Sequence, residues 1–285
     1  MATPKLALIP SAYKASKVYS PIPTNGDGDF TFTRASGATR VNKDGLIETV
    51  GDNIPRLDYL DGSCPSLLLE PSRTNLITHS EDFTNAAWTP TNVSLTTADI
   101  VSPSGELNAT KMEGTATSTK EINSVLSTTA SSDYTYSLYV KKGNTSTLTF
   151  STSSGSLNST FNLTTLIAVN GSIEDAGNGW YRLSATATAS GVTEVFQILL
   201  NPAEDAGTFQ YIYGTQVEEG SDVTSYIHTN GSIVTRAADV CTLDTTSLDL
   251  STITETFTDN STNVITVIPS SYSVSEGKIA KIIGG

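Results

Sequence analysis

The stretch Tyr134-Thr-Tyr-Ser-Leu-Tyr-Val140 alternates large apolar or aromatic side chains with small polar ones. Successive side chains of a β-strand point to opposite faces, so this alternation is typical of a strand with one face on a core. The same period of two recurs in Thr147-Leu-Thr-Phe-Ser151, Trp180-Tyr-Arg-Leu-Ser184 and Glu194-Val-Phe-Gln-Ile-Leu-Leu200. These segments are therefore predicted to be half-buried strands of an antiparallel sheet.

Turn-forming dipeptides separate the predicted strands. Glycine follows a small or polar residue at Ser154-Gly155, Asn170-Gly171, Asn178-Gly179 and Ser190-Gly191. No apolar stripe with the helical period of 3.6 residues is sustained in the sequence. The chain is therefore predicted to be all-β, with an antiparallel β-sandwich over residues 75–230.

The segment before the sandwich has a different pattern. Residues 1–29 contain four prolines and the acidic turn Asn25-Gly-Asp-Gly-Asp29, so they are predicted to form an extended N-terminal arm. Residues 30–74 alternate short strand candidates with turns, and Asp44-Gly45 between two apolar runs predicts a hairpin.

The C-terminal flank, residues 231–285, holds further strand candidates and an apolar end at residues 279–283. It is predicted to pack on the N-terminal region or on a neighbouring subunit. Two short repeats flank the sandwich, Phe32-Thr-Arg-Ala-Ser36 and Val234-Thr-Arg-Ala-Ala238. They are predicted to pair or to occupy equivalent environments, with a chance match as the other interpretation.

Charge and hydropathy exclude several classes of partner. Sixteen Lys and Arg against 29 Asp and Glu give a net charge of −13, which argues against nucleic acid. No segment approaches the roughly 20 apolar residues of a membrane span. The first apolar run ends at Pro10, too early for a secretory signal, so an extracellular role would require assembly in a cytoplasm followed by lysis. Cys64 and Cys241 leave a disulfide open and argue against zinc.

Residues that could carry chemistry are few. His79 and His228 are the only histidines, and neither lies in a motif that would supply a nucleophile or a metal. Adjacent carboxylates such as Glu81-Asp82 point to opposite faces of a strand and cannot form a catalytic pair by themselves. The chain is predicted not to be an enzyme and to have no nucleotide cofactor, and a depolymerase with carboxylates from different strands is the minor alternative.

Glycan binding would depend on exposed aromatic faces that stack on sugar rings. The candidates are Trp88, Trp180, Tyr181, Tyr211 and Tyr213. An aromatic residue that alternates with polar residues in a strand usually faces inward, so core packing is the other interpretation of each.

A structural calcium ion is the one cofactor that the sequence leaves open. Asn25, Asp27 and Asp29 alternate as oxygen donors do in a calcium loop, although the twelfth position lacks the bidentate glutamate. Glu218 and Glu219 are a second candidate pair.

The order of several motifs resembles a group of bacteriophage virion proteins of the tail-fibre, head-fibre or spike type. The resemblance includes Phe32-Thr-Arg-Ala-Ser-Gly-Ala-Thr-Arg-Val-Asn-Lys-Asp-Gly-Leu-Ile-Glu48, Asn53-Ile-Pro-Arg-Leu-Asp-Tyr59, Cys64-Pro-Ser-Leu-Leu-Leu-Glu-Pro-Ser-Arg-Thr-Asn-Leu76, Ser80-Glu-Asp-Phe-Thr-Asn-Ala-Ala-Trp88, Tyr211-Ile-Tyr-Gly-Thr-Gln-Val-Glu-Glu-Gly220 and Thr235-Arg-Ala-Ala-Asp239. These motifs cover both flanks and both ends of the sandwich.

The resemblance implies a jelly-roll sandwich similar to carbohydrate-binding modules, mounted on virion-attachment segments and commonly trimeric. It assigns residues 30–74 to attachment or oligomerisation, and it implies other virion proteins and host-surface glycans as partners. Relatives continue past Thr235-Arg-Ala-Ala-Asp239 into a further domain, whereas 46 residues follow here, which favours a short spike, head fibre or adaptor. The expected location is the surface of a virion assembled in the host cytoplasm. A stand-alone carbohydrate-binding protein is the alternative.

Overall fold

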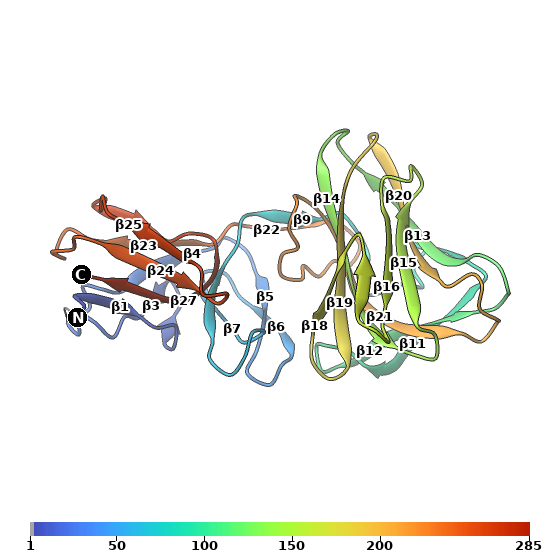
Figure 1. The fold of residues 1–285 in the computed structure, drawn as a ribbon, viewed down its shortest axis with the longest axis horizontal. Coiled ribbons are helices and arrows are strands. Elements are labelled where there is room, and N and C mark those ends of the chain that lie inside the picture. The colour runs from blue at the N-terminus through green and yellow to red at the C-terminus, as the bar shows by residue number, and fades with distance from the viewer. Residues whose placement is uncertain (1–2) are drawn as a thin grey trace. The chain divides into compact units, whose positions relative to one another are not determined.

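The computed structural model describes residues 3–285, and over this range the chain forms strands and turns without a helix. It divides into two compact units. Unit 1 consists of Met1–Arg73 and Arg236–Gly285, and unit 2 consists of Thr74–Thr235. In Figure 1 the blue and red strands make up unit 1, and the green and yellow strands make up unit 2.

Unit 2 consists of two six-stranded antiparallel sheets. The β20 sheet has the order β10 (Thr89–Thr91), β13 (Lys120–Ser127), β20 (Thr193–Leu200), β15 (Thr147–Thr152), β16 (Asn158–Asn162) and β17 (Ile167–Val169). The β21 sheet has the order β11 (Val93–Val101), β12 (Leu107–Gly114), β21 (Phe209–Glu219), β14 (Asp133–Lys142), β19 (Trp180–Thr188) and β18 (Ser172–Asp175).

The connections between these sheets follow jelly-roll topology. Eight strands, β12 to β16 and β19 to β21, give the orders β12-β21-β14-β19 and β13-β20-β15-β16, as in two interlocked Greek keys. The chain changes sheets after nearly every strand, with the β15–β16 hairpin as an exception. The prediction of an all-β, antiparallel jelly-roll sandwich is confirmed.

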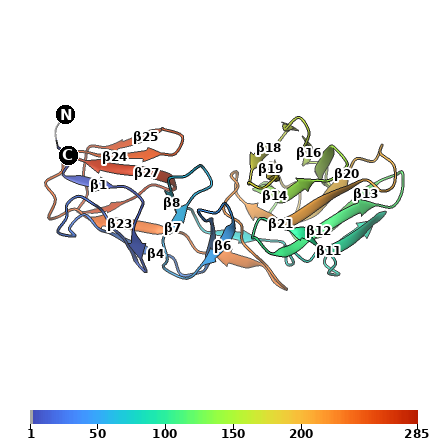
Figure 2. The same cartoon turned by 90° about the horizontal axis from the view of Figure 1, so that it is seen from below.

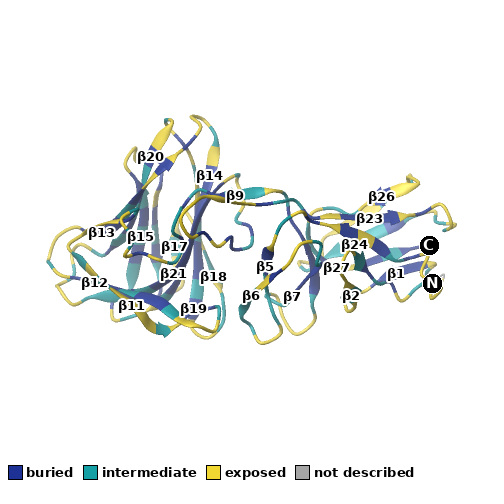
Figure 3. Cartoon of the chain, turned by 180° about the vertical axis from the view of Figure 1, so that it is seen from behind, coloured by how far each residue is buried: buried dark blue, intermediate teal, exposed yellow. Residues whose placement is uncertain are grey.

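The core of unit 2 lies between the two sheets, where the buried residues face one another (Figure 3). Tyr136 and Leu138 on β14 point into it, as their alternation predicts. The ring of Phe196 on β20 lies 5.0 Å from that of Tyr136 and 5.4 Å from that of Phe150, which joins strands of both sheets. Such aromatic pairs stabilise by about 1 kcal/mol beyond the area that they bury.

Unit 1 also packs two sheets on each other. One contains β25 (Thr262–Ile265), β24 (Ile253–Phe257), β27 (Gly277–Gly284), β8 (Ser66–Leu69) and β7 (Arg56–Asp58), with β1 (Leu6–Leu8) also paired to β27. The other contains β2 (Tyr13–Lys14), β3 (Lys17–Val18), β4 (Phe30–Thr33), β23 (Val240–Asp244) and β26 (Ser271–Ser273). Two short pairs complete the strands, β5 (Ala38–Val41) with β6 (Ile47–Val50) and β9 (Arg73–Asn75) with β22 (Val234–Arg236).

The N-terminal residues belong to the core of unit 1 rather than to an extended arm. Leu6, Leu8 and Val18 are completely buried. β1 pairs with β27, the last strand of the chain, and the two lie next to each other in Figure 2. The prolines of this segment lie outside β1, β2 and β3, so they remove no hydrogen bond from these strands.

The C-terminal flank packs within the same unit. Ile279 and Ile282 of β27 are completely buried, and β27 lies between β24 and β8. Of the two arrangements expected for residues 231–285, the structure shows packing on the N-terminal region of the same chain. Cys64 is exposed and Cys241 is buried, and both are free thiols.

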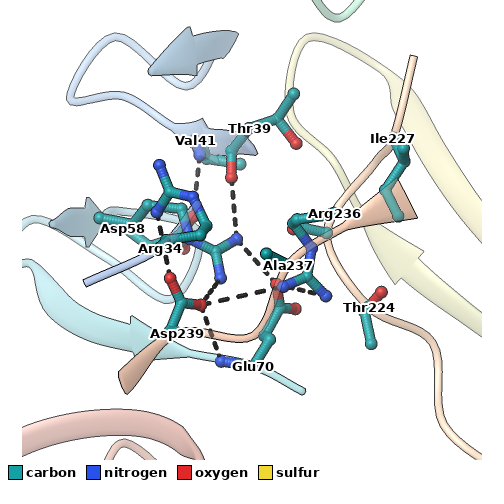
Figure 4. A network of polar contacts seen from close by, with 12 residues as sticks. Arg34, Thr39, Val41, Asp58, Glu70, Thr224, Ile227, Arg236, Ala237 and Asp239 are labelled. Carbon is teal, nitrogen blue, oxygen red and sulfur yellow. Dashed lines mark hydrogen bonds and ion pairs between the residues drawn. The ribbon is translucent and has the colours of Figure 1, made fainter. Parts of the chain in front are cut away.

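The two sequence repeats meet around one carboxylate, Asp239 (Figure 4). Arg34 of the first repeat places Nη1 3.0 Å from Asp239 Oδ1. Arg236 of the second repeat lies 3.9 Å from Asp239 Oδ2 and 3.4 Å from Glu70 Oε2. The repeats do not pair with each other, because β4 pairs with β3 and β23, and β22 pairs with β9, but Arg34 and Arg236 both lie against Asp239.

Arg56 links the two carboxylates of this network. Its Nη1 lies 2.7 Å from Glu70 Oε2, and its Nη2 forms an ion pair with Asp239 Oδ2. The side chains of Arg34, Arg56 and Asp239 have no exposed surface. Removing one partner from a buried ion network leaves an uncompensated charge, so the network makes the fold of unit 1 depend on all its members.

Candidate functional site

The outward face of the β21 sheet carries a group of buried tyrosines. Tyr139 on β14 is paired in register with Tyr213 on β21, and their ring centroids lie 6.2 Å apart. Tyr226, in the segment after β21, packs on both rings at 6.1 and 5.8 Å. All three side chains are buried, so a segment of unit 2 itself covers this part of the sheet.

One carboxylate, Glu81, collects the polar groups above these rings. Its Oε1 accepts hydrogen bonds from the hydroxyls of Tyr213 at 2.9 Å and Tyr226 at 3.0 Å. His228 Nδ1 lies 2.9 Å from the same oxygen. We refer to Glu81, His228, Tyr213 and Tyr226 as the Glu81 clamp, because it fastens the segments before β10 and after β21 to the sheet.

The clamp shifts the pKa values of its members. Burial would raise the pKa of Glu81, but the hydrogen bond and charge of His228 outweigh it and hold this pKa below its usual value. The hydrogen bond with Glu81 raises the pKa of His228. Burial and the nearby Glu81 charge raise the pKa of Tyr226, so its hydroxyl stays protonated and acts as a donor.

The clamp lacks the geometry of a hydrolytic triad. In such a triad the imidazole lies between a carboxylate and a nucleophilic hydroxyl or thiol. The nearest such group is Ser80, whose Oγ lies 2.6 Å from the Tyr226 hydroxyl and accepts the backbone N–H of Thr229 at 2.9 Å. Ser80 is completely buried, so these contacts occupy it structurally.

Two of the aromatic glycan candidates lie in the interior. Trp88 is 3% exposed and packs in the core, where its Nε1 donates to the carbonyl of His79 at 2.9 Å. Trp180 is 1% exposed, and its Nε1 donates to the carbonyl of Val101 at 3.2 Å. Neither indole offers a free face for stacking.

The remaining aromatic candidates differ in exposure. Tyr213 is buried in the Glu81 clamp, and Tyr181 is half-buried against the core. Tyr211 is half-exposed, and its ring lies 5.3 Å from that of Phe209 on the outward face of the β21 sheet. Lys111 Nζ lies 4.4 Å from the centroid of Phe209. Tyr181 and Tyr211 are therefore the two candidates that keep partial exposure.

The acidic turn at residues 25–29, a candidate calcium site, has carboxylates that contact donors of the protein itself. Asp29 Oδ1 accepts the backbone N–H of Ser20 at 3.0 Å, and its Oδ2 pairs with Lys17 at 3.2 Å. The amide of Asn25 donates to Asp27 Oδ2 at 2.7 Å. Protein donors therefore already contact both carboxylate oxygens of Asp29 and one oxygen of Asp27.

The second candidate pair for calcium, Glu218 and Glu219, differs in exposure. Glu218 is completely buried, and it accepts hydrogen bonds from Gln216 at 2.7 Å and from the backbone N–H of Thr224 at 2.9 Å. Glu219 is exposed. Among residues 3–285, no group of three or more His, Cys, Asp or Glu side chains is arranged to hold a metal ion.

An open groove of about 500 Å³ lies on the outward face of the β21 sheet, at its β18–β19 edge. It lies over residues that pair in register, Ser172 with Ser184 and Thr135 with Thr186. The residues that line it are Thr135, Gly171, Ser172, Ile173, Glu174, Ser184, Ala185, Thr186, Ser221, Asp222 and Val223. We refer to it as the β19 groove.

The β19 groove contains hydroxyl and carboxylate groups beside apolar side chains. Thr186 Oγ1 lies 2.8 Å from Thr135 Oγ1 and 3.1 Å from the carbonyl of Ser221, which fixes the loop at one end of the groove. Glu174 and Asp222 add carboxylates that can accept hydrogen bonds from ligand hydroxyls. The polar half of each alternating strand was the sequence signal for this groove, and none of the five aromatic candidates lines it.

Comparisons with known proteins give no family assignment. No protein-family model matches the chain, and no curated protein matches it. Among solved structures, the enzymatically active domain of tailspike protein 4 from bacteriophage CBA120 is similar at 14% identity and a TM-score of 0.35. That match covers 51% of this chain and 21% of the tailspike chain.

Carbohydrate-binding modules are similar at the same level. The module of Cellvibrio mixtus lichenase 5A, solved with cellotriose, matches at 13% identity and a TM-score of 0.29, over 55% of this chain and all of the module. The tandem modules of Paenibacillus barcinonensis Xyn10C match at 11% identity and a TM-score of 0.34, over 76% of this chain and 84% of theirs. Likenesses this distant assign no function, so the function is argued below from the chain itself.

Proposed function

We propose that the chain is a non-catalytic structural protein of a bacteriophage virion, a short fibre, spike or adaptor, whose sandwich binds host-surface glycans. Unit 1 attaches the chain to other virion proteins and assembles it into a homotrimer. Unit 2 is displayed on the particle surface, after assembly in the host cytoplasm. Structural calcium forms no part of this proposal.

The observation that carries the proposal is the convergence of the phage-like motifs. The motifs at residues 32–48 and 53–59, most of the motif at 64–76 and most of the motif at 235–239 belong to unit 1, although they come from both flanks of the sequence. The motifs at residues 80–88 and 211–220 belong to unit 2. In the unit 1 motifs, the charged members Arg34, Glu70 and Asp239 belong to one buried network. Both termini of the chain belong to unit 1, and the middle of the sequence forms unit 2. This division suits a protein in which one unit attaches to the virion and the other is displayed.

The β19 groove supports the glycan part of the proposal. Sugars present many hydroxyls, and the groove offers hydroxyl and carboxylate partners in a volume typical of ligand sites. Weak single-site binding suffices on a trimer or a particle, because several sites engage at once.

Two carboxylates of unit 2 are already bonded to protein donors. Glu81 is held by two tyrosines and a histidine, and Glu218 by Gln216 and Thr224. A glycosidase needs one carboxylic acid and one free carboxylate placed about a sugar bond. Incubation with host polysaccharide should therefore leave its chain length unchanged on gel filtration.

Light scattering of the purified chain tests the structural role. A mass of three chains is expected, and a single-chain mass at micromolar concentration would count against the fibre or spike assignment.

A broad array of bacterial surface glycans tests the binding role. Glu174→Gln should weaken any binding to the β19 groove by about tenfold, the cost of losing one hydrogen bond to a charged group. Asp205→Asn, an exposed carboxylate outside the groove, is the matched control. An array that stays blank with folded protein would remove glycan binding from the proposal.

The alternative is a stand-alone carbohydrate-binding protein. It is favoured by one observation, that unit 2 contains both a complete hydrophobic core and the β19 groove. A monomer that binds glycans would support this alternative over the virion role.

A further inference from the structure

A second cavity, in unit 1, has the features of a small ligand site. It has a volume of about 310 Å³ and lies beside the β5–β6 hairpin. Tyr13, Arg40, Glu48, Leu57 and Tyr59 contribute to its walls. We refer to it as the hairpin pocket. Its volume lies at the lower end of the range for ligand sites, which suits a ligand of one or two sugar units.

The hairpin holds the polar groups of this pocket in fixed positions. Arg40 on β5 is paired in register with Glu48 on β6, and Arg40 Nε lies 2.6 Å from Glu48 Oε1. Asn42 donates to Glu48 Oε2 at 3.3 Å. The other end of the same amide is fixed by the turn, since Asn42 Oδ1 accepts the backbone N–H of Asp44 at 2.9 Å.

The aromatic wall is joined to these groups. The Arg40 guanidinium lies over the ring of Tyr13, 5.5 Å from its centroid. Tyr13 and Tyr59 are both half-buried and pack against the core of unit 1, so each keeps part of its ring accessible. Arg40 is hydrogen-bonded to both Glu48 and Tyr13, and a guanidinium has five N–H donors, so N–H groups remain that can bind a ligand hydroxyl.

The charges of the pocket select against ions. Glu48 neutralises Arg40, and Lys43 and Asp44 at the rim carry opposite charges. The chain as a whole carries a net charge of −13, which repels anions further. A neutral ligand rich in hydroxyls, with an apolar ring face for the tyrosines, is the chemistry that remains.

We propose that the hairpin pocket binds one unit of a neutral saccharide, with Arg40, Asn42 and Glu48 bonded to its hydroxyls and Tyr13 and Tyr59 against its ring. This site is separate from the β19 groove, so a failure of either leaves the other standing. It gives unit 1 a ligand of its own beside the attachment role proposed above.

Saturation-transfer NMR on the full chain tests the proposal, with methyl glycosides of neutral hexoses and N-acetylhexosamines as probes. Methyl glycosides of hexuronic acids serve as the anionic comparison. We expect saturation transfer to at least one neutral glycoside and weaker transfer to the acids. Glu48→Gln should weaken the binding by about tenfold, because the neutral amide is a poorer acceptor and no longer fixes Arg40.

Controls separate loss of binding from loss of fold. Cys241 is buried in the core of unit 1, so its resistance to thiol reagents reports that the variant is folded. Tyr59→Leu keeps the apolar contact but removes the aromatic face, and it should also reduce the transfer. Asp205→Asn, an exposed carboxylate outside both the hairpin pocket and the β19 groove, should leave it unchanged. Silence with every neutral glycoside, tighter binding of the acids, or a signal that both pocket variants leave intact would overturn the proposal.

Discussion

Unit 2 and unit 1 reach similar sandwich-like packing by different routes. Unit 2 is one continuous stretch of chain, with strands of up to 11 residues whose inward and outward positions alternate. Unit 1 is assembled from both ends of the sequence, from strands that are mostly two to five residues long, and pairs Leu6 with Gly284. Unit 1 contains a buried ion network in addition to its apolar core.

The difference shows where each unit obtains its specificity. Apolar packing is non-directional, so long alternating strands are needed to fix register in unit 2. Short strands carry little such information, and in unit 1 the directional bonds of Asp239 to Arg34 and Arg56 fix how the two chain ends meet. We therefore expect the two units to respond separately to mutation.

The largest effect is expected for Asp239→Asn. This change leaves Arg34 and Arg56 without their shared negative charge, and it should lower the free energy of unfolding of unit 1 by about 4 kcal/mol. Thiol labelling of Cys241 in increasing urea measures it. Burial raises the pKa of this thiol to about 12, so it reacts only after unit 1 opens.

The matched control is Asp249→Asn, which breaks an ion pair between Lys5 and a fully exposed carboxylate. It should produce no measurable change, since water screens such pairs. Both tryptophans lie in unit 2, so their fluorescence follows that unit alone. A fluorescence transition that moves together with Cys241 labelling in Asp239→Asn would break the distinction between the units.

The converse change is Leu183→Ala in the core of unit 2. Leu183 is completely buried, so its removal should cost about 3 kcal/mol from transfer and cavity terms. Tryptophan fluorescence in urea measures this loss, while Cys241 labelling should stay unchanged. Val192→Ala, at a side chain that is 72% exposed, should leave both transitions in place. If Leu183→Ala and Val192→Ala shifted the fluorescence transition in urea equally, the placement of Leu183 in the core of unit 2 would be contradicted.

The comparison also explains what could be predicted from the sequence. The period of two in residues 134–140 gave the strand, its inward face and the sandwich, because local alternation decides all three. The similar segments around Arg34 and Arg236 led to the prediction that they pair or occupy equivalent environments, and the structure places both arginines against Asp239 without pairing the two segments.

Other features depended on contacts that no local pattern carries. Residues 1–29 resemble an arm because their prolines lie between short segments that have no local strand pattern, and only pairing with residues 282–284 makes β1 part of a core. Glu81 and His228 lie 147 residues apart, so no spacing rule could join them. Trp88 and Trp180 were named for glycans from residue type, whereas burial decided their role.

The smallest effect concerns the pH response of the Glu81 clamp, which sharpens the comparison because unit 1 contains no histidine. The pKa of His228 is raised, so its contribution to stability is full below about 6.5, the ordinary value, and is lost as pH rises through the raised pKa. The pKa of Glu81 is lowered, so this carboxylate stays charged throughout that window. Unit 2 should therefore lose stability between about pH 6 and pH 8.5.

His228→Gln isolates this contribution, because other titrating groups are common to both proteins. Since half of the imidazole is exposed, solvent screening keeps the difference below about 1 kcal/mol. Urea unfolding followed by tryptophan fluorescence at pH 6 and pH 8.5 should show a smaller pH dependence in the variant, and Cys241 labelling should show the same dependence in both. An unchanged pH dependence of unit 2 would mean that the covering segments are held by Tyr213 and Tyr226 alone, and that the His228 pair with Glu81 adds nothing to the clamp.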